Sequence, residues 1–287
     1  MTPDRKVLAC VDQSHYADNI ADYAAWAAHR MNAPLEFLHV LDRHPEQSTG
    51  GDYSGALGMD AQETLLAELS DKDEARSRTA REQGRLFLNR LRERALAAGI
   101  TAPDVRQRHG QLEETLVEQQ GAVRLFVLGR RGESAESTKR DLGRNVERIA
   151  RAVRKPILTV TENFKEPQRA MIAFDGGITT RRGVRMVAES PLFKGLPVHL
   201  LMSGKDSSDA RKQLDWARRT LEEAGFEAPA SLVPGDAESI IARAVKEQGI
   251  DLLIMGAYAH SPLRTLLLGS KTSDLLRSAT IPTLLLR

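Results

Sequence analysis

Cysteine is nearly missing from this chain of 287 residues, and so are long apolar runs and any strong excess of charge. Because Cys10 is the single cysteine, no intramolecular disulfide can form, which fits a reducing compartment. No apolar run reaches the roughly 18 residues that indicate a membrane-spanning helix. The net charge of +2 gives no general attraction toward nucleic acid or an anionic membrane. The opening segment MTPDRKVLAC carries charges where a signal peptide needs an apolar core, so we expect a cytoplasmic location.

Several catalytic motifs are missing as well. The segment LLLGSKT has a serine between Gly269 and Lys271, so it is not a phosphate-binding P-loop. Neither VDQSHY nor FDGGIT matches the S-G-G-x-D-S of ATP pyrophosphatases, and no G-x-S-x-G elbow occurs. The seven histidines show no paired metal-ligand spacing. We therefore expect a binding protein without a metal site of its own, not an efficient enzyme, and we interpret Cys10 as a small residue in a buried strand.

The chain that remains is an internal repeat. KVLACVDQS at 6–14 is similar to RAMIAFDGG at 169–177, and each is an apolar run that ends in aspartate. RLFVLGRRG and DLLIMGAYA both end an apolar run in glycine, and RAVRKPILTV parallels RSATIPTLLL. The sequence thus predicts two homologous domains, 1–162 and 168–287, divided by the polar linker TENFKEPQ.

An insertion distinguishes the first half from the second. Asp12 and Asp175 lie 163 residues apart, whereas Gly110 and Gly235 lie only 125 residues apart. The first half therefore carries 38 extra residues between its second and third strands, around 44–83. Their composition predicts a flexible loop followed by a charged helix that extends toward solvent.

Within each half, short apolar runs alternate with helical patterns. This alternation predicts an α/β fold with a parallel sheet, and runs without polar interruption indicate strands buried on both faces. Ligands of such open, Rossmann-like sandwiches bind at the carboxyl ends of the strands. The predicted strands include 35–41, 124–128, 156–160, 198–202, 251–255 and 282–286.

Asp12 and Asp175 end the first strand of their halves. A carboxylate at this place can accept hydrogen bonds from ribose hydroxyls or from an adenine edge. The same carboxylate could instead cap the following helix without any ligand. The residues alone leave both interpretations open.

The second half also carries a glycine-containing segment after its fourth strand. Gly256 follows this strand, and Gly269 and Ser270 precede the next predicted helix. Glycines allow backbone N–H groups to approach a phosphate, and a helix N-terminus adds partial positive charge. Ser270 can donate its hydroxyl and Lys271 lies close by. Alternatively, the two glycines only shape turns.

These motifs resemble those of tandem universal stress proteins over essentially the whole chain apart from the insertion. The nucleotide-binding version of that family carries G-x-x-G, nine residues, and then G-[S/T]. The second half keeps this spacing from Gly256 to Gly269 and Ser270, but Ala259 replaces the second glycine.

The first half departs differently from the family pattern. It keeps both loop glycines, Gly129 and Gly132, but the spacing to Gly143 is one residue longer. Arg144 replaces the serine or threonine, and Asn145 offers a donor one position later. We therefore expect the better nucleotide site in the second half.

The resemblance implies two five-stranded sheets of order 3-2-1-4-5 that pair through their last strands, PILTVT and PTLLLR. It allows further dimerisation between chains. It also implies ATP, with or without Mg²⁺, as the ligand. The residues that it places around the adenine are Cys10, Val40 and Leu128 in the first half and Ala173, Ser203 and Met255 in the second.

Two hypotheses about function follow. The first is a regulator of the stress response that binds an adenine nucleotide, mainly in the second half, and signals to an unknown protein partner. The second is an interaction scaffold without nucleotide, in which both motifs are relics. Slow ATP hydrolysis is a third hypothesis, ranked last because no catalytic base is evident in the sequence.

Overall fold

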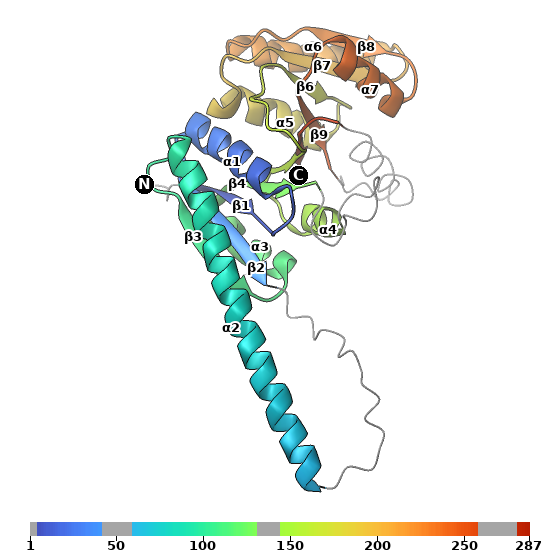
Figure 1. The fold of residues 1–287 in the computed structure, drawn as a ribbon. Coiled ribbons are helices and arrows are strands. Elements are labelled where there is room, and N and C mark those ends of the chain that lie inside the picture. Colours follow the sequence, from blue (N-terminus) through green and yellow to red (C-terminus); the bar gives the residue numbers. More distant parts are fainter. Residues whose placement is uncertain (1–4, 42–58, 131–143, 258–279) are drawn as a thin grey trace.

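The computed structural model describes residues 5–41, 59–130, 144–257 and 280–287, with only the backbone described at 59–77, 144 and 145. Within these ranges the chain builds one ten-stranded sheet that is covered by helices on both faces (Figure 1). Within them no helix is long and apolar enough to cross a membrane.

The first half alternates strands and helices as the sequence predicts. Its short apolar runs become buried strands, and the polar run DVRQRH becomes an edge strand with partly exposed residues. Its elements in chain order are β1 (Lys6–Cys10), α1 (Ala17–Met31), β2 (Leu35–Leu41), α2 (Met59–Ala97), β3 (Asp104–His109), α3 (Leu112–Gln119), η1 (Gln120–Ala122), β4 (Val123–Gly129), α4 (Arg144–Ala152) and β5 (Ile157–Val160).

The described part of the second half follows this alternation from its first strand to its fourth, with a much shorter helix in place of α2. Local signals start its helices: the side chain of Ser207 accepts the N–H of Ala210, and that of Asp236 accepts the N–H of Ser239. The elements are β6 (Ala170–Ala173), α5 (Ile178–Glu189), η3 (Pro191–Phe193), β7 (Val198–Ser203), α6 (Ser208–Glu223), β8 (Ala230–Val233), α7 (Ala237–Glu247), β9 (Leu252–Gly256) and β10 (Thr283–Leu286).

The strand order is β3-β2-β1-β4-β5-β10-β9-β6-β7-β8, so each half has the predicted order 3-2-1-4-5. Strands are parallel within each half, and β5 pairs antiparallel with β10, with Leu158 opposite Leu284. The hydroxyl of Thr159 also donates to the carbonyl of Thr283 at 3.1 Å. The predicted pairing of the last strands is confirmed. Because β5 and β10 are antiparallel, the strands of the two halves run in opposite directions, and their carboxyl ends lie on opposite sides of the sheet.

Two layers of buried apolar side chains cover the sheet. One layer lies under α1, α2, α5 and α6, and the other lies under α3, α4 and α7. The sheet is therefore buried on both faces, which explains why its central strands read as continuous apolar runs. The domain limits 1–162 and 168–287 stay a prediction.

The predicted helix of the insertion forms as α2, which has 39 residues. Its last turns pack on the body through Leu88, Leu91 and Ala95, which are at most 3% exposed. Figure 1 shows its first part running well beyond the sheet. Residues 42–58 of the insertion lie outside the described residues.

Candidate functional site

The carboxyl ends of β6, β7 and β9 meet at one edge of the second half. Ala173 ends β6 and pairs with Met255 of β9, so these two predicted adenine-pocket residues are cross-strand neighbours. Ser203 ends β7, two positions after Leu201, the other partner of Ala173. Side chains two positions apart along a strand share a face, so Ala173, Ser203 and Met255 lie on the same side of the sheet.

Asp175 follows at this edge and is exposed. Its Oδ1 accepts the N–H of Gly177 at 2.8 Å and the hydroxyl of Thr180 at 2.5 Å. No donor among the described residues is hydrogen-bonded to Oδ2. One carboxylate oxygen thus holds the start of α5, and the other has no hydrogen-bond partner among the described residues. Asp175 does not cap α5 in the usual sense, because its Oδ1 binds the N–H of the N-cap residue Gly177 and the Thr180 hydroxyl. The carboxylate still keeps an acceptor for a ligand.

Glycines around Asp175 bring backbone and side chains close together. Gly176 has φ +74°, and a side chain there would collide with Gln213 of α6. A Cβ on Gly177 would lie 3.0 Å from Oδ1 of Asp175. A Cβ on Gly256 would lie 3.3 Å from the Thr180 methyl carbon. Gly176 suits glycine because of its positive φ, whereas at Gly177 and Gly256 a Cβ would only tighten contacts with Asp175 and Thr180.

The first half arranges its aspartate differently. Oδ1 of Asp12 accepts both the N–H and the hydroxyl of the buried Ser14, and Asp12 has at least one further interaction. Cys10 pairs with Leu128 as Ala173 does with Met255. Cys10 is 6% exposed, and burial, with a smaller contribution from Glu36, raises the pKa of its thiol far above the usual value. Cys10 is therefore a neutral core residue and not a nucleophile.

The other first-half candidates lie near the carboxyl ends of the first-half strands, as Asp12 does. Val40 is partly buried and packs against the apolar cluster that contains Cys10 and Leu128. Gly129 ends β4 opposite Val160. The arrangement matches the second half in outline, since Oδ1 of each aspartate accepts one backbone N–H and one hydroxyl, but Asp12 has a further interaction.

The phosphate-loop predictions fall mainly on residues that the structure does not describe. For Asn145 only the backbone is described, and it lies in the first turn of α4. Residues outside the description are Gly132, Gly143, Ala259, Gly269, Ser270 and Lys271.

Sequence reasoning missed the polar side chains that shape the second-half edge. Thr180 holds Asp175, and Gln213 lies over Gly176. The two adjacent threonines of GGITT are the one sequence signal that could have indicated the role of Thr180. Gln213 comes from a different helix and has no local signal. Within the described residues, no group of His, Cys, Asp or Glu side chains could hold a metal ion.

Comparison with known proteins gives the context for this geometry. The family model described as Universal stress protein family matches residues 4–161 and 190–287. Universal stress protein Slr1230 of Synechocystis sp. is 33% identical over 286 residues, which covers 99% of this chain and 100% of that protein. A universal stress protein structure from Archaeoglobus fulgidus has a TM-score of 0.71 at 17% identity and covers 98% of each chain.

Two further solved structures are complexes with nucleotides. One universal stress protein is in complex with cAMP and another, from Archaeoglobus fulgidus, is in complex with dAMP. Each covers 43% of this chain, at 18% and 19% identity and with TM-scores of 0.37 and 0.34. The bound cAMP and dAMP are observations on those two proteins.

Proposed function

Because this chain belongs to the universal stress protein family, we propose that it is a regulator that binds an adenine nucleotide, mainly through its second half. One observation carries the proposal: Oδ2 of Asp175 is not hydrogen-bonded to any described residue, at an exposed strand end beside the paired Ala173 and Met255. A ribose hydroxyl can donate to this oxygen, and a flat base can lie on small and apolar side chains.

The residues present fit part of an ATP molecule. Asp175 would hold the ribose, while Ala173, Ser203 and Met255 would line the base. Gly256, Ala259, Gly269, Ser270 and Lys271 are the residues predicted to surround the phosphates, with Mg²⁺ bound to the nucleotide. The bound nucleotide would alter these loops and thereby the contact with a protein partner in the cytoplasm. The first-half set of Asp12, Val40, Gly129, Gly132, Gly143 and Asn145 would form the weaker site.

The experiment compares matched variants in the two halves. Asp175→Asn keeps an acceptor for Gly177 and Thr180 but removes the charge that strengthens a bond from a ribose hydroxyl. We expect calorimetric titration with Mg-ATP to show about tenfold weaker binding, the effect of one charge-assisted hydrogen bond. Asp12→Asn is the matched control and should change the affinity less than about twofold. A loss in Asp12→Asn but not in Asp175→Asn would place the site in the first half and contradict the proposal.

The loop is tested by two substitutions. Ser270→Ala should weaken ATP binding, because it removes a hydroxyl donor to phosphate. Ala259→Gly should strengthen it, because it restores the glycine that the family pattern has. Unchanged affinity in both variants would mean that the segment does not contact the phosphates.

An interaction scaffold without nucleotide is the second candidate, and α2 favours it. This helix carries six acidic residues and one lysine from 59 to 75, and seven arginines and two glutamates from 76 to 97. A projecting helix with separated charges offers a surface to a protein partner. Denaturing the freshly purified protein and identifying released nucleotide by mass spectrometry separates the two candidates, and phosphate release from ATP tests for slow hydrolysis.

A further inference from the structure

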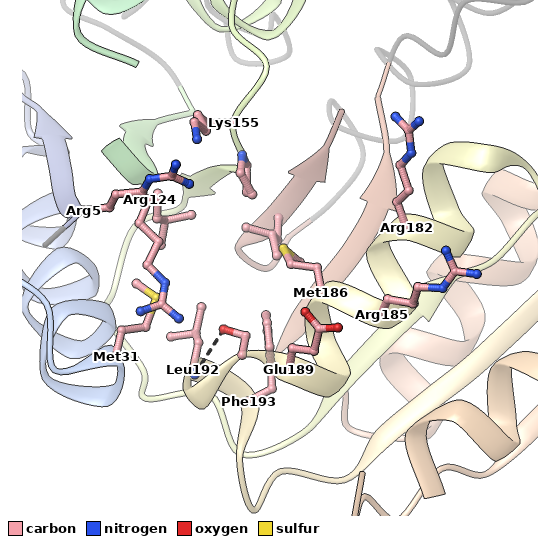
Figure 2. Close-up of a pocket in the computed structure, with 14 residues that line it drawn as sticks. Arg5, Met31, Arg124, Lys155, Arg182, Arg185, Met186, Glu189, Leu192 and Phe193 are labelled. Carbon is pink, nitrogen blue, oxygen red and sulfur yellow. Dashed lines mark hydrogen bonds between the residues drawn. The ribbon is translucent and has the colours of Figure 1, made fainter. Parts of the chain in front are cut away.

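A cavity lies at the junction of the two halves, on the sheet face that α1 and α5 cover. Its volume is about 590 Å³. Figure 2 shows Arg5, Arg124 and Lys155 on one side and the α5 residues Arg182 and Arg185 on the other. Among the described residues, the lining comes from both halves and includes none that are predicted to bind nucleotide.

Positive charge dominates the rim of this cavity. No carboxylate of the described residues forms an ion pair with Arg5, Arg124, Lys155 or Arg182, and Glu189 is the single acidic residue of the lining. Burial, and then repulsion from Arg5, lower the pKa of Lys155. Five cations gathered around one carboxylate repel one another, so an anion bound among them would relieve the repulsion.

The floor of the cavity is apolar. Met31, Leu125, Leu192, Phe193 and Leu284 line it, and each is at most 6% exposed. Arg185 is partly engaged elsewhere, since its guanidinium carbon lies 5.5 Å from the ring centre of Trp216. An occupant that matches both surfaces has an apolar body on the floor and a negative group at the rim.

The internal repeat provides a counterpart of this cavity. Cys10 pairs with Leu128 as Ala173 pairs with Met255, so residues of the two halves correspond at offsets of 163 and 127. By these offsets Arg124 corresponds to Asp251, Arg182 to Asn19, and Met186 to Tyr23. The three counterparts lie where the linker between the halves packs.

The linker occupies the counterpart positions. The backbone N–H of Phe164 donates to Asn19 at 2.9 Å, and its ring lies edge-on to Tyr23 at 4.7 Å. Lys165 forms an ion pair with Asp251 at 3.3 Å. The ring of Phe164 and the cation of Lys165 thus occupy the place that corresponds to the cavity.

The protein charge in the cavity is opposite to the protein charge at the corresponding linker-filled position. The linker brings a cation to Asp251, whereas the corresponding residue of the open cavity is Arg124. We propose that the cavity between Arg124, Lys155 and Arg182 binds a small organic anion whose aromatic or apolar body rests on Leu284 and Phe193 and whose phosphate or carboxylate meets the cations.

The test uses 1-naphthyl phosphate as the probe, titrated into the full-length protein by calorimetry. We expect saturable 1:1 binding, with neutral 1-naphthol and inorganic phosphate each at least about tenfold weaker because each lacks one half of the match. The carboxylate 1-naphthoate, titrated in parallel, shows whether a phosphate or a carboxylate is preferred.

Substitutions locate the binding. Arg124→Gln and Lys155→Gln should each weaken binding of the probe about tenfold. Arg154→Gln is the matched control, because Arg154 is an exposed neighbouring cation outside the lining, and it should bind like the unsubstituted protein. Excess ATP should leave probe binding unchanged, as should Asp175→Asn. Circular dichroism confirms that each variant is folded.

Three results would overturn the proposal. The first is no saturable binding of 1-naphthyl phosphate or 1-naphthoate by the folded protein. The second is equal affinity in the Arg124, Lys155 and Arg154 variants. The third is displacement of the probe by ATP, which would place the probe in the nucleotide site. Because these readouts do not depend on Asp175, they stand or fall separately from the proposed nucleotide binding.

Discussion

Replacement of Asp251 by alanine should release the linker from the second half. Asp251 precedes β9, and its side chain is 11% exposed. Its Oδ1 accepts the backbone N–H groups of Gln168 at 3.0 Å and Arg169 at 2.8 Å. These two bonds fix the residues that lead into β6, so one carboxylate joins the linker to the central strands of its half.

The expected loss follows from these bonds. A hydrogen bond to a charged acceptor contributes about 1.5–3 kcal/mol, and both bonds share one oxygen that water can partly replace. We therefore take the lower value for each and expect Asp251→Ala to reduce the free energy of unfolding by about 3 kcal/mol. For a chain of this size that corresponds to a fall in Tm of about 6–12 °C.

Two variants separate the parts of this effect. Asp251→Asn keeps an oxygen acceptor and loses only the charge, so its loss should be about 1 kcal/mol. Lys165→Gln removes the ion pair, but Lys165 is 71% exposed, so its loss should stay below about 0.5 kcal/mol.

The assay is urea unfolding followed by far-ultraviolet circular dichroism, with amide hydrogen exchange at Gln168 and Arg169. In Asp251→Ala the protection of these two amides should fall together with the global stability. A variant within about 0.5 kcal/mol of the unsubstituted protein would refute the reasoning, because it would mean that the linker can detach without cost.

Three further outcomes are expected. Cys10 should resist iodoacetamide at about pH 8 in the folded protein and react in urea, because burial raises the pKa of its thiol and withholds the thiolate. Lys155→Gln should raise the free energy of unfolding at neutral pH, with a smaller gain in about 0.5 M salt. The lowered pKa of Lys155 means that the unfolded chain binds its proton more tightly. The cost is therefore present at neutral pH and disappears as pH rises from the folded pKa toward the ordinary lysine value of 10.5. Leu284→Ala should cost about 2–5 kcal/mol of unfolding free energy in thermal melts, because Leu284 is 1% exposed at the junction of the sheets, while Ile178→Ala, at a position 74% exposed, should cost under about 0.5 kcal/mol.

The sequence predicts the sheet well where burial is strong. β2, β4, β7 and β9 are mainly apolar, with Glu36, Arg124 and His199 among their few polar residues, and both their faces are covered, so composition indicates them. The edge strands β3 and β8 are polar or partly exposed, with segments DVRQRH and ASLV, and they carry little periodic signal. Their existence follows from the repeat and from the resemblance, not from their own residues.

The candidate site is predictable only in part. The strand-end positions of Asp12 and Asp175 follow from the alternation of apolar runs and turns. The difference between the two carboxylates does not, because it depends on Ser14 in one half and Thr180 in the other. The cationic cavity is still less predictable, since it joins residues as far apart as Arg5 and Leu284. Such a cavity results from the packing of the two halves.

The long helix α2 determines how this protein should behave in solution. At about 1.5 Å per residue its 39 residues span about 58 Å, whereas ten strands at about 4.8 Å spacing span only about 43 Å. The last turns of α2 pack on the body and only its first part projects, but a body with such a projection still diffuses more slowly than a sphere of the same mass. A monomer of 31.7 kDa should therefore elute early from a sizing column, as a larger globular protein would. Only a shape-independent measurement, such as light scattering or sedimentation equilibrium, can then count the chains.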